Sequence, residues 1–304
     1  MTETSTAPAI HDRLSELGVE FDPAIPYRLE KIFPKLEGWG VKKAIRRKGK
    51  LIGSIEPELK EMLQPGEEVL YVAKGLQYSL AEQYFLGIWS HTINHTVFVL
   101  TNLRVLMMRT NTKGVPKHTF WMIFYSQMVK FKGTWHGSFV VKLKDKKTLK
   151  FSGFPTEDRK QMRMVFEDAV EHYRELGFDP EVTQSVENLC TYCKQTVPKD
   201  VHDCGQCGAT FWKPSTVAIR SFVFPAWGDI LLKHYVLACA ELCGYAVTWF
   251  IIVGAIFSGL ERGDPAFGLI VAAILLPFTH TVDALLTYAI AKKGLTPKTA
   301  PAAA

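Results

Sequence analysis

Cys190-Thr-Tyr-Cys193 and Cys204-Gly-Gln-Cys207 are two short cysteine pairs with ten residues between them. The chain before them is polar enough to be soluble, whereas most of the chain after Ser221 is as apolar as a membrane segment. Two such pairs can close on one tetrahedral ion, and Zn²⁺ binds four thiolates at about 2.3 Å in closed, structural sites. Disulfides or redox-active dithiols are the alternatives. The spacing favours a structural zinc ion with the ligands Cys190, Cys193, Cys204 and Cys207.

This cysteine pattern resembles the short zinc-ribbon modules of bacterial membrane proteins, which share its spacing and the glycine after the last cysteine. The resemblance implies a small zinc ribbon over residues 186–213 with no open coordination position, and therefore a structural metal. Lys194 departs from the pattern, because such modules usually have glycine at that position. A zinc ion with four thiolates has a net charge of about −2, which Lys194, Lys199 and Lys213 are expected to offset.

Charge is unevenly distributed over the 304 residues, whose formal net charge is +6. Residues 41–50 contain six basic side chains and no acidic one. They could form a solvated helix face or linker, bind nucleic acid, or contact anionic lipid headgroups at about 1 kcal/mol per basic residue. Attachment to a membrane would favour the lipid. The candidate contact residues are Lys42, Lys43, Arg46, Arg47, Lys48 and Lys50.

The N-terminal segment 1–63 is expected to be a helical arm that contains this basic run. Short helices are expected at 10–17, 27–36 and 56–63, with Pro57 at the start of the last one, where its missing N–H would have no partner. Residues 1–9 lack the basic start and the apolar run of a secretory signal. Together with thiols kept for a metal, this predicts that the soluble part lies in the reducing cytoplasm.

Residues 64–178 have the pattern of a β-rich domain that ends in a helix. Apolar residues from Met162 to Leu176 recur at three- and four-residue steps, which predicts an amphipathic helix. The connection 76–95 is too long for a simple turn and predicts an inserted helix or loop. Runs rich in β-branched and aromatic residues alternate with turn signals and predict strands at 69–73, 96–100, 104–108, 119–125, 139–143 and 148–151.

Three segments of this region resemble the bacterial pleckstrin-homology (PH) domain. They are Leu63-Gln-Pro-Gly-Glu-Glu-Val-Leu70 as its opening strand, Leu100-Thr-Asn-Leu-Arg-Val-Leu106 as its central hairpin, and Thr148-Leu-Lys-Phe151 as its last strand. The resemblance implies a PH-like β-sandwich or barrel with a C-terminal helix, which is a platform for lipid or protein contact and not a catalyst. Lipid binding does not follow from the fold alone.

Two apolar runs, 235–258 and 265–291, are each long enough to cross the hydrocarbon core of about 30 Å as a helix. The short connection 259–264 allows only an antiparallel hairpin, in a membrane domain at 222–292. Basic residues flank its outer ends and the connection contains only Arg262, so the positive-inside rule places both ends in the cytoplasm. We expect a multi-pass protein of the bacterial inner membrane with a disordered tail at 293–304. A buried hairpin of a soluble protein is the alternative.

Glu241, His280 and Asp283 are ionisable residues inside or at the edge of the apolar runs. The number of residues from Lys233 to Glu241 is similar to the number from Asp283 to Lys292. In an antiparallel hairpin Glu241, His280 and Asp283 would therefore reach a similar depth in the membrane. Ionisable residues in a membrane are costly and usually face a partner or a cavity. Alternatively, the spans are shorter and the carboxylates lie among the headgroups.

The sequence contains no phosphate-binding glycine loop, nucleophile elbow or H-E-x-x-H motif. We therefore expect a multi-domain α+β membrane protein that is a non-enzymatic, membrane-anchored adaptor or scaffold, with a protein partner and a capacity to self-associate. A second interpretation is a small oligomeric transport or channel subunit that uses Glu241, His280 and Asp283. A third is a membrane-tethered nucleic-acid-binding protein, which attachment to a membrane disfavours.

Overall fold

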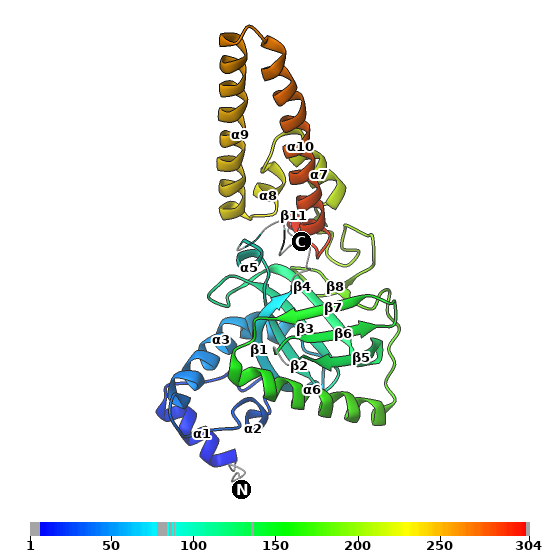
Figure 1. The fold of residues 1–304 in the computed structure, drawn as a ribbon. Coiled ribbons are helices and arrows are strands. Elements are labelled where there is room, and N and C mark those ends of the chain that lie inside the picture. Colours follow the sequence, from blue (N-terminus) through cyan, green and yellow to red (C-terminus); the bar gives the residue numbers. More distant parts are fainter. Residues whose placement is uncertain (1–6, 78–83, 85–86, 88, 135–136, 302–304) are drawn as a thin grey trace. The chain divides into compact units, whose positions relative to one another are not determined.

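The computed structural model describes residues 7–77, 84, 87, 89–134 and 137–301 (Figure 1). The chain forms two compact units, one made of Met1–Gly208 with Pro301–Ala304 and the other of Ala209–Ala300. The first, the sheet unit, is mixed α+β, and the second, the helical unit, consists mainly of helices. The predicted α+β class is therefore confirmed at this level.

A large antiparallel sheet forms the centre of the sheet unit (Figure 1). Within the described residues it has nine strands in the order β5-β6-β7-β1-β2-β3-β4-β8-β9. All the predicted β-rich runs correspond to strands, and β5, β8 and β9 are additional. The strands are β1 Val69–Gln77, β2 His95–Thr101, β3 Arg104–Thr110, β4 Pro116–Phe124, β5 Met128–Gly133, β6 Phe139–Leu143, β7 Thr148–Ser152, β8 Glu187–Leu189 and β9 Thr196–Val197.

The helices of the sheet unit include one inside the long connection 76–95, as predicted. Residues 78–83, 85–86 and 88 of that connection lie outside the described residues. The predicted helix after the last β-rich run is also present. The helices are α1 Ala7–Glu16, α2 Leu29–Ile32, α3 Val41–Met62, α5 Trp89–Ile93 and α6 Thr156–Leu176, with the short 3₁₀ helix η1 at Tyr125–Gln127.

Both faces of the sheet are covered by helices, which explains why its central strands are apolar on both sides. Val99 and Leu106 pack in one core with residues of α1, α2 and α3. The neighbouring Phe98 and Leu100 belong to a second core, which contains the apolar stripe of α6. The switch between cores from one residue to the next is the two-residue period of a strand. Residues 7–62 therefore form one wall of the sheet unit's core.

The basic run lies within helix α3 and does not form a linker. The helix continues to Met62 with Pro57 inside it, so the prediction of a separate helix that begins near Pro57 is wrong. Ile45, Ile52 and Leu59 are buried at regular intervals along one face, and this apolar stripe holds the helix against the sheet. Many lysine and arginine residues lie between these buried residues, so the apolar stripe is hard to recognise in the sequence.

The helical unit is built on two long helices that form a hairpin (Figure 1). Each has 27 residues, and many apolar side chains are exposed, such as Phe250 at 79% and Leu269 at 67%. Both helices are long and apolar enough to cross a membrane. They approach closely at Gly268, where an added Cβ would lie 2.5 Å from Cα of Ile256. The elements are β10 Thr210–Phe211, α7 Pro214–Val223, α8 Trp227–Leu231, α9 Tyr235–Glu261, α10 Pro265–Ala291 and β11 Pro297–Thr299.

The tail 293–304, predicted to be disordered, contains a strand in its described part. β11 pairs antiparallel with β10, and the hydroxyls of Thr210 and Thr299 lie 2.6 Å apart. The backbone N–H of Trp212 donates to the carbonyl oxygen of Thr296 at 2.9 Å. The Pro/Ala-rich composition gave no sign of this pairing, because its partner lies far away in the sequence.

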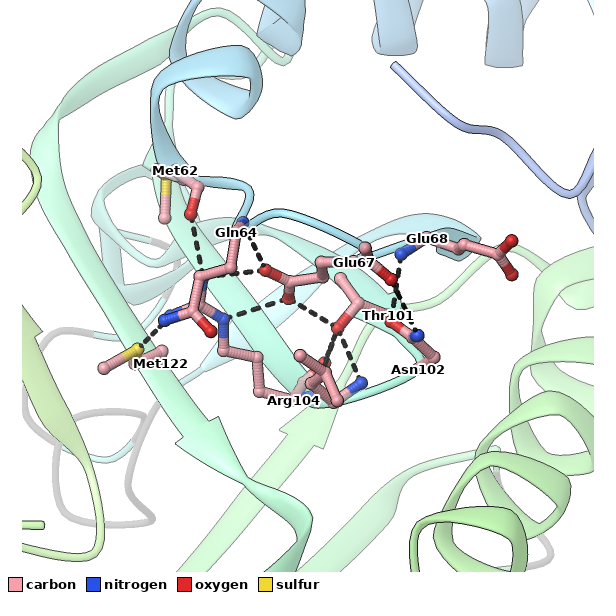
Figure 2. A network of polar contacts seen from close by, with 10 residues as sticks. Met62, Gln64, Glu67, Glu68, Thr101, Asn102, Arg104 and Met122 are labelled. Carbon is pink, nitrogen blue, oxygen red and sulfur yellow. Dashed lines mark hydrogen bonds and ion pairs between the residues drawn. The ribbon is translucent and has the colours of Figure 1, made fainter. Parts of the chain in front are cut away.

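A buried ion pair lies at the turn between β2 and β3, in the Leu-Thr-Asn-Leu-Arg segment of the sheet unit (Figure 2). Glu67 accepts hydrogen bonds from Arg104 at 2.9 and 2.8 Å and from the Thr101 hydroxyl at 2.7 Å. Arg104 also donates to the carbonyl oxygen of Met62, at the end of α3, at 2.7 Å. The side chains of Arg104 and Glu67 are 4% and 0% exposed. Each therefore depends on the other for neutralisation.

Replacing Arg104 with methionine should lower the free energy of unfolding by about 3–5 kcal/mol, because the Glu67 carboxylate would stay buried without its partner. The matched control Arg28→Ala removes a solvent-exposed ion pair with Glu68 and should cost about 0–1 kcal/mol. Urea unfolding of the full chain in detergent, followed by circular dichroism, measures both. Adding Glu67→Gln to Arg104→Met should recover part of the loss. Equal costs for Arg104→Met and Arg28→Ala would contradict the stabilising role of the network.

Candidate metal centre and buried carboxylates

The four cysteines of the sequence pattern come together in the sheet unit, next to β8 and β9. Sγ of Cys190 lies 3.6 Å from Sγ of Cys207, and Sγ of Cys193 lies 3.5 Å from Sγ of Cys204. A disulfide requires about 2.05 Å between its sulfurs, whereas four ligands at about 2.3 Å from a tetrahedral ion are about 3.8 Å apart. The cluster therefore has the dimensions of a site for one metal ion and not of two disulfides.

The acidities of the thiols indicate that the cluster needs a positive charge. Burial raises the pKa of Cys190, and it raises the pKa of Cys193 to about 12. Burial also disfavours the Cys204 thiolate, but hydrogen bonds from the backbone N–H groups of Cys207 and Gln206, together with those from the thiols of Cys193 and Cys207, outweigh it and lower the pKa of Cys204 to about 7. Four adjacent thiolates repel one another, so they cannot all ionise without a cation. A bound metal ion would remove this conflict.

Lys194 attaches the first cysteine pair to the rest of the sheet unit. Its backbone is left-handed, with φ of 57°, which explains why related patterns have glycine there. The side chain is 6% exposed, and its ammonium group contacts the carboxylates of Glu58 and Glu61 on α3. It also donates to the carbonyl oxygen of Thr191 at 2.7 Å and lies over the ring of Phe120. Lys194 therefore balances carboxylates of α3 and not, as the sequence predicted, the thiolates.

The cysteine segment is less independent than a separate zinc ribbon would be. β8 pairs with β4 of the main sheet, and β9 pairs with β8, so the first cysteine pair lies on a hairpin that extends this sheet. The four cysteines belong to the sheet unit, whereas β10, which lies within the predicted ribbon 186–213, belongs to the helical unit. The sheet unit therefore includes the whole candidate metal site.

The six basic residues of the run on α3 divide into two groups. Lys48 donates at 2.7 Å to both Asp158 and the hydroxyl of Tyr71, and burial lowers the pKa of its ammonium group. Arg47 forms an ion pair with Glu157. These two residues join α3 to α6 and β1 and leave their charge balanced within the sheet unit. Arg47 is exposed despite its ion pair, and the other exposed members of the run are Lys42, Lys43, Arg46 and Lys50.

The helical unit brings Glu241 and Asp283 together, as the antiparallel hairpin predicted. The third member of the cluster is Asp229 of α8 and not His280. One carboxylate oxygen from each of Asp229, Glu241 and Asp283 lies within 4.8 Å of the others. The ring of His280 instead contacts a carbonyl oxygen of α7 and, at 3.2 Å, the hydroxyl of Tyr245.

Asp229 was not among the site residues predicted from the sequence. It is fully buried, and burial raises its pKa to about 7, although a hydrogen bond from Thr287 opposes the shift. The signal that could have identified it is its position, since it is the charged residue of the apolar segment 222–232. A charge in such a segment requires a partner.

Substituting serine for Cys204 should abolish stoichiometric metal binding at the cysteine cluster, because three thiolates no longer close a tetrahedral site. The unaltered chain should retain one ion of a thiolate-binding metal such as zinc, as measured by inductively coupled plasma mass spectrometry of the full chain purified in detergent. The control Cys239→Ser with Cys243→Ser removes two exposed thiols of α9 and should leave the metal content unchanged. A metal-free unaltered chain, or full metal content in Cys204→Ser, would contradict the assignment.

Comparisons with known proteins do not place the chain in a family. No family model matches it, and no curated protein matches it. One similar solved structure is the crystal structure of the C-terminal domain of an unknown protein from Leishmania infantum, which is 13% identical, covers 42% of this chain and 97% of its own, and has a TM-score of 0.28. A likeness at this level carries no argument about fold or function. The resemblances to PH domains and zinc ribbons remain predictions.

Proposed function

We propose that the protein is a non-enzymatic membrane-anchored adaptor, in which the helical unit is the anchor and the sheet unit binds a lipid or protein partner. The observation that carries this proposal is the contrast between the two units. Apolar side chains are exposed all along α9 and α10, whereas most of those of the sheet unit are buried in two cores. Exposed apolar surface on this scale is characteristic of a membrane or protein interface.

The strand order of the sheet unit supports a PH-like fold. β1 to β4 are consecutive antiparallel neighbours, β5 to β7 are a second such series, and β7 pairs with β1. One long helix, α6, follows directly. The strands β1 to β7 thus precede the long helix α6, which is the order that the resemblance to PH domains implies. Because the fold alone assigns no ligand, the partner has to be inferred from the surface.

The exposed part of α3 is the surface we assign to that partner. Lys42, Lys43 and Arg46 are exposed, and Trp39 in the preceding segment is fully exposed. Tryptophan is favoured at membrane interfaces, and each basic residue near an anionic surface contributes about 1 kcal/mol. This combination suits anionic headgroups better than it suits an uncharged surface.

Zinc is the metal that the cysteine cluster favours. Thiolates select borderline or soft ions, and four of them from one chain complete a tetrahedral Zn²⁺ site. Cys190, Cys193, Cys204 and Cys207 would hold the ion with no position left for a substrate. The zinc would then contribute to folding and not to catalysis.

Flanking charges support an orientation with both termini in the cytoplasm of a bacterial cell. The connection between α9 and α10 contains one basic residue, Arg262, together with Asp264. The positive-inside rule and the reduced state that a thiolate site requires favour the same side. The basic residues near the outer ends of the two helices are Lys213, Arg220, Lys233, Lys292, Lys293 and Lys298.

One observation favours a second candidate, a small oligomeric transport or channel subunit. Asp229, Glu241 and Asp283 cluster between the helices of the helical unit, where an ion pathway would need polar side chains. Two spans per chain would require several chains to enclose a path. The third candidate, a nucleic-acid-binding protein, receives no comparable support.

Washing membranes with alkaline carbonate should leave the full chain in the pellet, because α9 and α10 would be held by the hydrocarbon core. Immunoblotting of pellet and supernatant measures this distribution. Release into the supernatant would refute the anchor.

Exchanging Lys42, Lys43 and Arg46 for alanine should weaken binding to anionic lipid by about two orders of magnitude, because about 1 kcal/mol is lost per basic residue and about 1.4 kcal/mol is tenfold. The anionic lipid or protein that copurifies with the tagged full chain should fall accordingly. Mass spectrometry of the purified material measures both. The matched control exchanges Lys130, Lys132 and Lys142, which are also exposed, and should retain the partner. The double variant Glu241→Gln with Asp283→Asn should retain it as well, whereas a transport subunit would lose its function in this variant.

A further inference from the structure

Three carboxylates of the helical unit lie together. Asp229, Glu241 and Asp283 come from α8, α9 and α10, so three different helices contribute one residue each. Asp229 is 0% exposed and Asp283 is 7% exposed. The contacts that the structure describes for these side chains include no lysine or arginine. No ion pair among the described residues therefore neutralises the cluster.

Unpartnered oxygens within this cluster are a separate indication that a ligand belongs there. Oδ2 of Asp229 accepts a hydrogen bond from the Thr287 hydroxyl at 2.9 Å, and Oδ2 of Asp283 accepts one from the N–H of Ala226 at 3.0 Å. The other oxygen of each aspartate, Oδ1, is buried and has no hydrogen-bond partner, and the same is true of Oε2 of Glu241. Leaving such atoms unpaired is costly.

The surrounding packing holds Asp229 in place. A Cβ on Gly228 would lie 2.4 Å from a methyl carbon of Thr287 and 2.5 Å from Oγ of Ser221, so only glycine allows α8 to come this close. The N–H of Gly228 donates to Ser221 Oγ at 3.0 Å, and the Ser221 hydroxyl lies 3.0 Å from that of Thr287. Because Thr287 donates its proton to Asp229, it can only accept in its contact with Ser221. The chain of donors thus ends at the carboxylate and orients it.

The donor atoms decide which ligand suits the cluster. All three residues offer carboxylate oxygen, and none offers sulfur or nitrogen. Oxygen donors suit the hard cations Mg²⁺, Mn²⁺ and Ca²⁺, whereas Zn²⁺ and Cu²⁺ usually take nitrogen or sulfur ligands. A divalent ion would leave about one negative charge, next to the N–H of Ala226 and the hydroxyl of Thr287. The nearby imidazole of His280 is engaged by α7 and Tyr245.

We propose that Asp229, Glu241 and Asp283 form a binding site for one hard divalent cation. The ion would join α8, α9 and α10 and remove the repulsion among the three carboxylates. The site differs from the cysteine centre in donor chemistry, and it does not depend on the adaptor function. Ala226 and Thr287 are positioning residues. Each donates a hydrogen bond to Oδ2 of one aspartate and leaves its Oδ1 free to bind the ion.

Mn²⁺ is the probe that tests the site, because the electron paramagnetic resonance signal of free Mn²⁺ is lost on binding. The full chain, purified in detergent with its cysteine centre loaded with zinc, should bind one Mn²⁺ per chain, and excess Mg²⁺ or Ca²⁺ should displace it. Asp229→Asn with Asp283→Asn should weaken binding by more than about tenfold. Thr287→Val, which removes only the orienting hydroxyl, should weaken it by about tenfold.

The matched control is Glu261→Gln with Asp264→Asn, which removes two exposed carboxylates near the connection of the same two helices. It should bind Mn²⁺ like the unaltered chain. Zinc content and gel filtration show whether each variant is folded, and Thr287→Val provides the test if the double asparagine variant is not. The absence of saturable Mn²⁺ binding in the unaltered chain would overturn the proposal, and protons would then neutralise the cluster. Equal binding by the folded Asp229→Asn with Asp283→Asn variant would overturn it as well.

Discussion

Buried charge has to be balanced inside this protein, and much of its packing depends on the pairs that achieve this. In the sheet unit, Lys48 bonds to Asp158 of α6, and Lys194 of the cysteine hairpin contacts Glu58 of α3. Helix α3, whose composition suggests a solvated surface, is therefore joined by ion pairs to α6 and to the cysteine segment, and the lysine of each pair is largely buried. Arg104 adds a further connection, because it binds Glu67 and the last turn of the same helix.

In two places the described contacts include no lysine or arginine that would balance the charge. The four thiols of the sheet unit and the three carboxylates of the helical unit both concentrate potential negative charge in little space. Their donor atoms are different, sulfur in one and oxygen in the other, so they select different classes of cation. The thiols form a closed set that suits a structural ion. The carboxylates are held by hydrogen bonds from Thr287 and Ala226, with further oxygens left unpartnered.

Elements with a strong local period could be predicted from the sequence. The β-rich runs, the amphipathic helix α6 and the two long apolar helices all follow from alternation, helical spacing or length. Elements that depend on a distant partner could not be predicted. β11 forms because β10 offers its backbone hydrogen bonds, and β8 forms because it extends the edge at β4. The length of α3 was missed because its basic residues outnumber the buried stripe that stabilises it.

The sequence by itself determined the four-cysteine site, and it indicated that Glu241 and Asp283 could reach a similar depth. Cysteine pairs two residues apart bring their sulfurs together locally, and an antiparallel hairpin aligns residues at similar distances from its ends. Only the tertiary structure decided that Asp229 completes the carboxylate cluster while His280 faces elsewhere. That choice depends on α8 lying against α10, which the absence of a side chain at Gly228 permits. A close approach between segments that are distant in the sequence produces no periodic pattern of residues, so it cannot be predicted from the sequence alone.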